Sequence, residues 1–79
     1  MRVISPDYTI NVGYENGVFC VITDEQAGEY AIGFRNIDLK GYLPMAIYKT
    51  KDEAIKVIKE MSTAAIKATN VNDVFVIKA

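Results

Sequence analysis

The chain has 79 residues, which is the length of one small domain, and half of them are apolar, which is too many for a disordered segment. Nine basic and ten acidic side chains give a net charge of −1, which argues against a nucleic-acid backbone binder, with its basic excess, and against a strongly acidic DNA mimic. Cys20 is the only cysteine and no apolar run approaches the ~20 residues of a membrane span, so we expect a single cytoplasmic domain over residues 1–79.

The first part of the chain predicts two strands joined by a turn. The segment "RVIS" (2–5) is a short strand, and Pro6 and Asp7 suit the second and third positions of the turn after it. Residues 8–15 alternate between apolar and polar side chains, which indicates a second strand.

An Asn-Gly pair at positions 16 and 17 separates two apolar runs and predicts a two-residue hairpin turn. This register places Tyr14 opposite Phe19 and Glu15 opposite Val18. One face of the hairpin is then a core face, made of Ile10, Val12, Tyr14, Phe19 and Val21. The other face keeps Val18, Cys20 and Ile22, which suits self-association or a partner; the alternative is a curled sheet or a folded-over loop that covers them.

Two further strands follow. Residues 29–35 alternate, with Tyr30, Ile32 and Phe34 on one side, and Gly33 indicates a bulge or a close backbone approach. A loop closed by Gly41 leads to a strand over residues 42–49. Because Pro44 cannot donate a ladder hydrogen bond, we expect this strand to be an edge or to carry a bulge.

A helix begins after Thr50, since Thr50 and Glu53 have the spacing of a capping box. Its apolar stripe consists of Ala54, Val57, Ile58, Met61, Ala65 and Ala68. Asn70 is expected to close the helix in a left-handed conformation, and residues 73–78 form the last strand. The fold is therefore α+β: an antiparallel sheet of about five strands with one amphipathic helix on one face, in the order β-β-β-β-α-β.

The chain lacks the residues that several common kinds of catalytic site need. Without histidine, and with one cysteine, the chain cannot form a zinc site or a Cys-His nucleophile. The glycines have neither dinucleotide nor Walker spacing. The adjacent carboxylates Asp24-Glu25 and Asp52-Glu53 lie where solvated charge is common. We expect no enzyme, no catalytic residue, no metal and no cofactor.

Binding side chains are better represented. Five tyrosines and two arginines are the usual interface anchors. The candidate binding residues are Tyr14, Glu15, Arg35, Lys40 and Tyr42. For Arg35 alone, a surface ion pair at a rim is the competing interpretation.

The segment "MRVISPDYTINVGYE" resembles the start of small proteins from prophages and phages of Gram-positive bacteria. The shared frame is Met1 to Ser5, Thr9-Ile10-Asn11 and Gly13-Tyr14-Glu15, and "MAIYKTKDEAIKVIKEM" is similar to their later part. This chain has Tyr8 where they have a turn glycine, Gly13 where they have proline, and an additional Asn-Gly pair. The resemblance implies a phage or prophage origin and carries no activity or site residue.

Small proteins of that origin often act stoichiometrically on host machinery. We therefore expect a binding protein that inhibits a host factor, as an anti-defence (anti-CRISPR-like) protein. One alternative is an oligomer that sequesters a host signalling nucleotide between subunits, and another is a minor structural or regulatory phage protein. No nucleic-acid duplex and no membrane is expected as a partner.

We also expect at least a dimer. Ile55 and Ile66 lie three turns apart on one flank of the helix, outside the main stripe. Together with Val18, Cys20 and Ile22 they give two apolar surfaces that one helix and one sheet cannot both bury. The alternative is that strand twist brings both isoleucines into the core.

Overall fold

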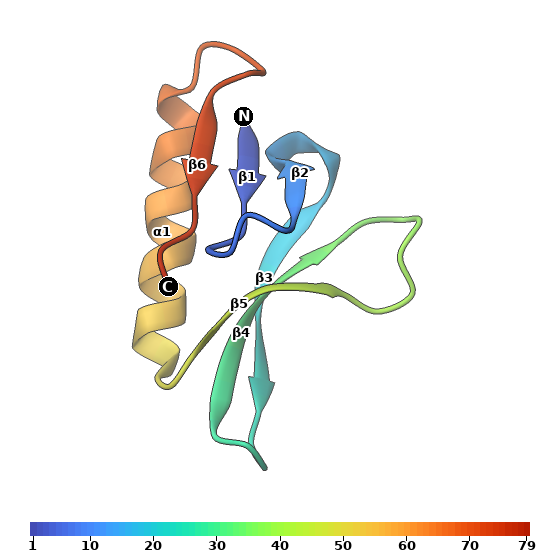
Figure 1. The fold of residues 1–79 in the computed structure, drawn as a ribbon, viewed down its shortest axis with the longest axis vertical. Coiled ribbons are helices and arrows are strands. Elements are labelled where there is room, and N and C mark those ends of the chain that lie inside the picture. Colours follow the sequence, from blue (N-terminus) through green and yellow to red (C-terminus); the bar gives the residue numbers. More distant parts are fainter.

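The computed structural model describes all 79 residues, and it has six strands and one α-helix. Figure 1 shows their arrangement. The elements are β1 (Arg2–Ile4), β2 (Asn11–Gly13), a one-turn 3-10 helix η1 (Tyr14–Asn16), β3 (Val18–Asp24), β4 (Glu29–Arg35), β5 (Leu43–Tyr48), α1 (Lys51–Lys67) and β6 (Val74–Val76).

The α+β class is confirmed, but the strands form two sheets instead of one sheet of about five strands. One sheet has the order β2-β1-β6 and the other β3-β4-β5, and five strands instead of four precede the helix. Strands β1 and β6 are parallel, and the other neighbours are antiparallel.

The turn between β1 and β2 follows the prediction. The amide of Tyr8 donates to the carbonyl of Ser5 at 2.9 Å, which puts Pro6 and Asp7 at the two central positions. One Asp7 oxygen, Oδ1, accepts from the Ser5 hydroxyl and from the Thr9 hydroxyl and amide. These bonds, those from Thr9 first, lower the pKa of Asp7 to about 2.

The predicted hairpin at Asn16-Gly17 is wrong. Gly17 has an extended backbone (φ −175°), whereas a type I′ turn needs positive φ. Strand β2 pairs with β1, where Val12 lies opposite Val3, and the Arg2 guanidinium binds the Asn11 side chain at 2.9 Å. The chain then turns through η1 into β3, which pairs with β4.

The predicted core face of that hairpin nevertheless packs inward. Its five side chains are partly buried against the core: Ile10, Val12, Tyr14, Phe19 and Val21. The rings of Tyr14 and Phe19 stack with their centroids 5.7 Å apart. The helical turn η1 therefore brings these rings together without a ladder between β2 and β3.

Glycine and proline have the predicted effects in the second sheet. The register of β4 against β5 shifts between Ile32 and Gly33, and β5, which contains Pro44, is an edge strand. A Cβ added at Gly33 would lie 2.9 Å from the Ile22 side chain and 3.0 Å from the Tyr42 ring. Both the bulge and the close approach are therefore confirmed.

The helix begins as predicted and ends differently. The hydroxyl of Thr50 accepts from the amide of Glu53 at 3.2 Å and donates to its carboxylate at 2.9 Å. At the other end, Asn70 does not take a left-handed conformation, because only Tyr8 among non-glycine residues has positive φ. Instead the Asp73 carboxylate accepts hydrogen bonds from the backbone amides of Thr69 and Asn70, in the turn that follows the helix.

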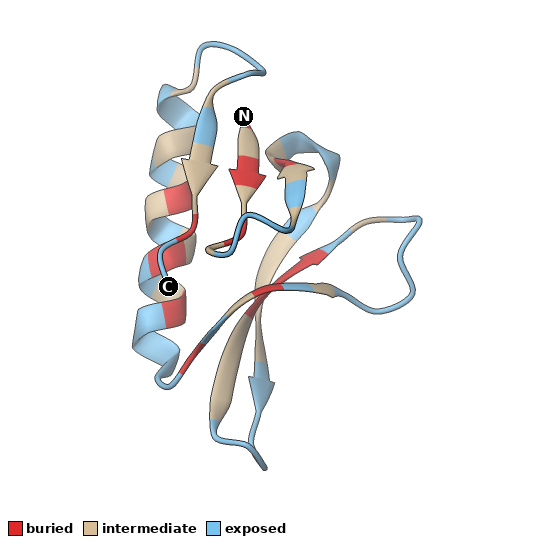
Figure 2. Ribbon diagram, viewed as in Figure 1, coloured by how far each residue is buried: buried red, intermediate tan, exposed pale blue.

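One core joins the helix to both sheets (Figure 2). Ten buried residues form this core. They are Met1 before β1, Val3 in β1, Ile32 and Phe34 in β4, Met45 and Tyr48 in β5, Ala54, Val57 and Met61 in α1, and Ile77 after β6. The helix packs against β3, β4 and β5. It covers the face to which Ile32 and Phe34 point and leaves the opposite face of that sheet without a helix.

Candidate functional site

The loop between β4 and β5, residues 36–42, projects from the body of the protein (Figure 1) and is almost wholly exposed. Its tip carries Ile37, whose exposed fraction of 98 % makes it the most exposed large apolar residue of the chain. The amide of Asp38 donates to the Asn36 side chain at 3.0 Å, and that of Leu39 to the Asn36 carbonyl at 3.2 Å. We call residues 36–42 the apolar loop. These bonds give the apolar loop a defined turn.

One basic side chain, Arg35, precedes the apolar loop, and another, Lys40, lies within it. The structure has two ion pairs, Met1 with Glu15 and Lys49 with Glu29, so Arg35 and Lys40 are both unpaired. Tyr42 is 43 % exposed, and its ring lies over Gly33 at the base of the loop. An apolar tip beside unpaired cations and a half-exposed tyrosine has the composition of a protein-binding surface.

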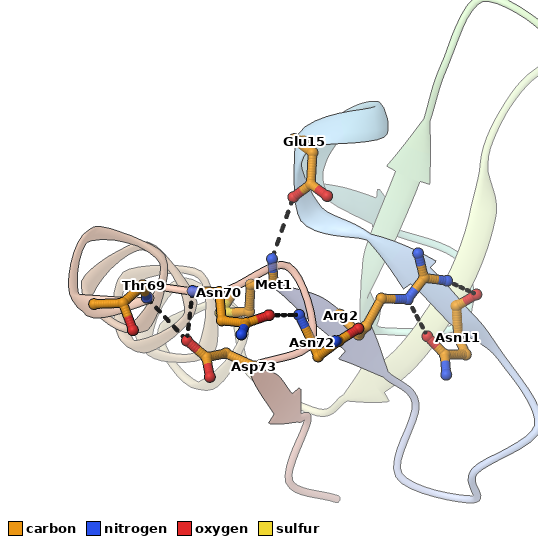
Figure 3. Close-up of polar contacts among 8 residues, drawn as sticks. All are labelled: Met1, Arg2, Asn11, Glu15, Thr69, Asn70, Asn72 and Asp73. Atoms are coloured by element: carbon orange, nitrogen blue, oxygen red, sulfur yellow. Dashed lines mark hydrogen bonds and ion pairs between the residues drawn. The ribbon is translucent and has the colours of Figure 1, made fainter.

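Tyr14 and Glu15 belong to a different place, a hollow of about 260 Å³ between η1 and the end of α1. Figure 3 shows the N-terminal ammonium of Met1 donating to Glu15 there, at 3.4 Å. A hydrogen bond from its own backbone amide and this ammonium lower the pKa of Glu15. No Lys or Arg side chain lines the hollow, so its lining offers a phosphate no side-chain cation.

The structure therefore divides the five predicted binding residues. Arg35, Lys40 and Tyr42 lie together in and beside the apolar loop, while Tyr14 and Glu15 line the hollow at η1. The two arginines also differ, because the Arg2 guanidinium is engaged with Asn11 inside the first sheet.

The five predicted interface residues are divided as well. Val18, Cys20 and Ile22 point to the face of the second sheet that α1 does not cover, and Val18 is 67 % exposed. Ile55 is half-buried, whereas Ile66 is 85 % exposed, so the flank of the helix is not wrapped into the core at Ile66.

No group of three His, Cys, Asp or Glu side chains is placed to hold a metal ion. The length and the polarity of α1 do not suit a bilayer-spanning helix.

Ile37 and Leu39 are not among the predicted site residues, because the sequence places them in a loop. One signal for them was present: Ile37 and Leu39 stand between Asn36 and Gly41, in a segment predicted to be a loop, and loops run over the protein surface. The chain matches no protein-family model, no curated protein and no solved structure.

Proposed function

We propose that the protein is a phage- or prophage-encoded binding protein that inhibits a host factor stoichiometrically in the bacterial cytoplasm, as an anti-defence protein. In this proposal the apolar loop inserts into an apolar groove of the host protein. The resemblance of the chain's two ends to phage proteins supports the origin, and the exposed Ile37 supports the mode of action.

The exposed Ile37 is the observation that carries the proposal. Full burial of an isoleucine side chain in a partner contributes about 1.5–3 kcal/mol. The loop connects two paired strands of one sheet, so its ends are fixed before binding. Fixed ends reduce the conformational entropy that the loop loses on association, which favours affinity.

The charges beside the loop define the partner's chemistry further. Arg35 and Lys40 are unpaired, while Asp38 is the only acidic residue of the loop, so this end of the protein is basic. A groove with acidic groups at its rim would be the complementary surface, and such charges mainly raise the association rate.

The test combines capture with a biological readout. The immobilised protein is expected to retain one host protein from a bacterial lysate at equimolar amount, and its expression to restore phage plating on a host with active defence. Ile37→Ser should reduce retention about tenfold or more, because it removes roughly 2 kcal/mol of apolar burial.

Ile66→Ser is the matched control, since it also replaces a highly exposed isoleucine but lies on the helix. This variant should retain the host protein and the plating phenotype. Equal retention by both variants, or wild-type protein that neither captures a host protein nor changes plating, would overturn the proposal.

A further inference from the structure

The uncovered face of the second sheet is apolar in its middle. Strand alternation and the pairing register bring its side chains together. They are Val18, Cys20 and Ile22 of β3, Ala31 of β4, and Pro44 and Ile47 of β5, with the Tyr42 ring over Gly33. We call this set the open face. Ile47 is 57 % exposed, and a shallow hollow of about 190 Å³ lies between it and Ile22.

Opposite charges lie at the two ends of the open face. Arg35 ends β4 opposite Val18, and the adjoining loop contains Asp38 and Lys40. At the other end, about 20 Å away along β4, Glu29 lies opposite Asp24, and Glu25 follows. Lys49 pairs with Glu29 at 3.6 Å, which leaves this end acidic by two charges, whereas the Arg35 end is basic by one.

This distribution of charge distinguishes the ways in which two copies could stack through the open face. A two-fold axis along the strands would bring like ends together, basic on basic and acidic on acidic. A two-fold axis across the strands reverses the second copy, so that its Glu29 end lies over the Arg35 end of the first. The second arrangement buries the same apolar side chains and pairs opposite charges.

We propose that the open face is the interface of a two-fold homodimer in which the strands of the two copies run in opposite directions. Three strands of seven residues or fewer cover about 14 by 20 Å. This footprint of roughly 300 Å² per copy is well below the ~800 Å² per partner of a standard interface, so we infer a weak dimer that forms at high micromolar concentration. The interface leaves α1 outside, including Ile55 and Ile66, because the helix packs on the other side of the sheet. Ile37, which carries the proposed function, is not part of the open face, so the inference does not rest on that function, although Arg35, Lys40 and Tyr42 belong to both surfaces.

Sedimentation equilibrium from 5 to 200 µM tests the apolar part. The mass is expected to rise from that of the 8.8 kDa chain toward twice that value. Ile47→Glu and Ile22→Glu should each raise the dissociation constant about tenfold or more. Ile47 is 57 % exposed, so its replacement is expected to leave the fold intact. Lys59→Glu, on the solvated face of the helix, and Ile66→Glu should leave it unchanged. A monomer mass for wild-type protein at 200 µM, or an Ile66→Glu variant as weak as Ile47→Glu, would refute the proposed interface.

A charge exchange tests the direction of the strands. Glu29→Arg and Arg35→Glu should each weaken the dimer, since each places like charges opposite one another across the interface. The double variant should recover most of the wild-type affinity, because the two ends are then exchanged in both copies. Failure of the double variant to recover, with circular dichroism showing folded protein, would exclude the reversed arrangement.

Discussion

At the scale of single residues, Tyr8 is the clearest conflict between side chain and backbone. It is the only residue other than glycine with positive φ (63°), and its ring is exposed. The left-handed conformation costs a residue with a Cβ about 1–2 kcal/mol. The position is imposed by its neighbours, because the Tyr8 amide must reach the Ser5 carbonyl while Asp7 holds Thr9.

Tyr8→Gly should therefore raise the free energy of unfolding by about 1 kcal/mol, since glycine adopts this conformation without the Cβ clash. Urea denaturation followed by circular dichroism measures the change. Tyr8→Ala is the control, because alanine removes the ring and keeps the Cβ. A gain of equal size in Tyr8→Ala would show that the ring, and not the backbone, is responsible.

At the scale of elements, local signals were reliable where no other part of the chain competed with them. The helix start depends on Thr50 and Glu53 alone, and it is where the sequence predicts it. The Asn-Gly turn signal is also local, but residues 11–13 pair with β1, and the chain needs η1 to reach β3. A Cβ at Gly17 would lie 2.3 Å from the Arg35 carbonyl, so this glycine serves a close approach to β4 that sequence spacing cannot reveal.

The same contrast holds for the candidate site. Arg35, Lys40 and Tyr42 could be chosen by residue type, and they lie beside the apolar loop. Tyr14 and Glu15 were grouped with them by composition, although η1 places them against the end of α1. Ile37 could not be recognised as exposed from its residue type, because an isoleucine is usually buried.

Thr50→Ala should lower the free energy of unfolding by about 1 kcal/mol, because it leaves the Glu53 amide and carboxylate without their partner. Thr63→Ala, on the same helix, is the matched control. Its hydroxyl only donates to the Lys59 carbonyl at an exposed position, so its removal should be neutral within about 0.5 kcal/mol. Chemical denaturation of both variants makes the comparison, and equal losses would argue against a specific cap.

At the scale of the whole molecule, we expect neither sheet to be stable without the other. The strands β1, β2 and β6 have three residues each, which is the lower limit for a strand. The second sheet is longer, but its inner face packs into the same cluster of buried residues as Val3 and Ile77. In addition, the hydroxyl of the core residue Tyr48 donates to the carbonyl of Lys78, which links β5 to the segment after β6.

Because they share this core, the two sheets should unfold as one cooperative unit. Ile77→Ala creates a cavity beside the first sheet and should lower the free energy of unfolding by about 2–5 kcal/mol. Hydrogen exchange then distinguishes the possibilities, since the Ile77 amide donates to the Ile4 carbonyl of β1, whereas β4 pairs only with β3 and β5. The slowest amides of β4 should lose protection by the same free energy as those of β1. Ile66→Ala, which removes an exposed side chain, should change neither. Full protection in β4 beside a weakened β1 would mean that the two sheets open independently.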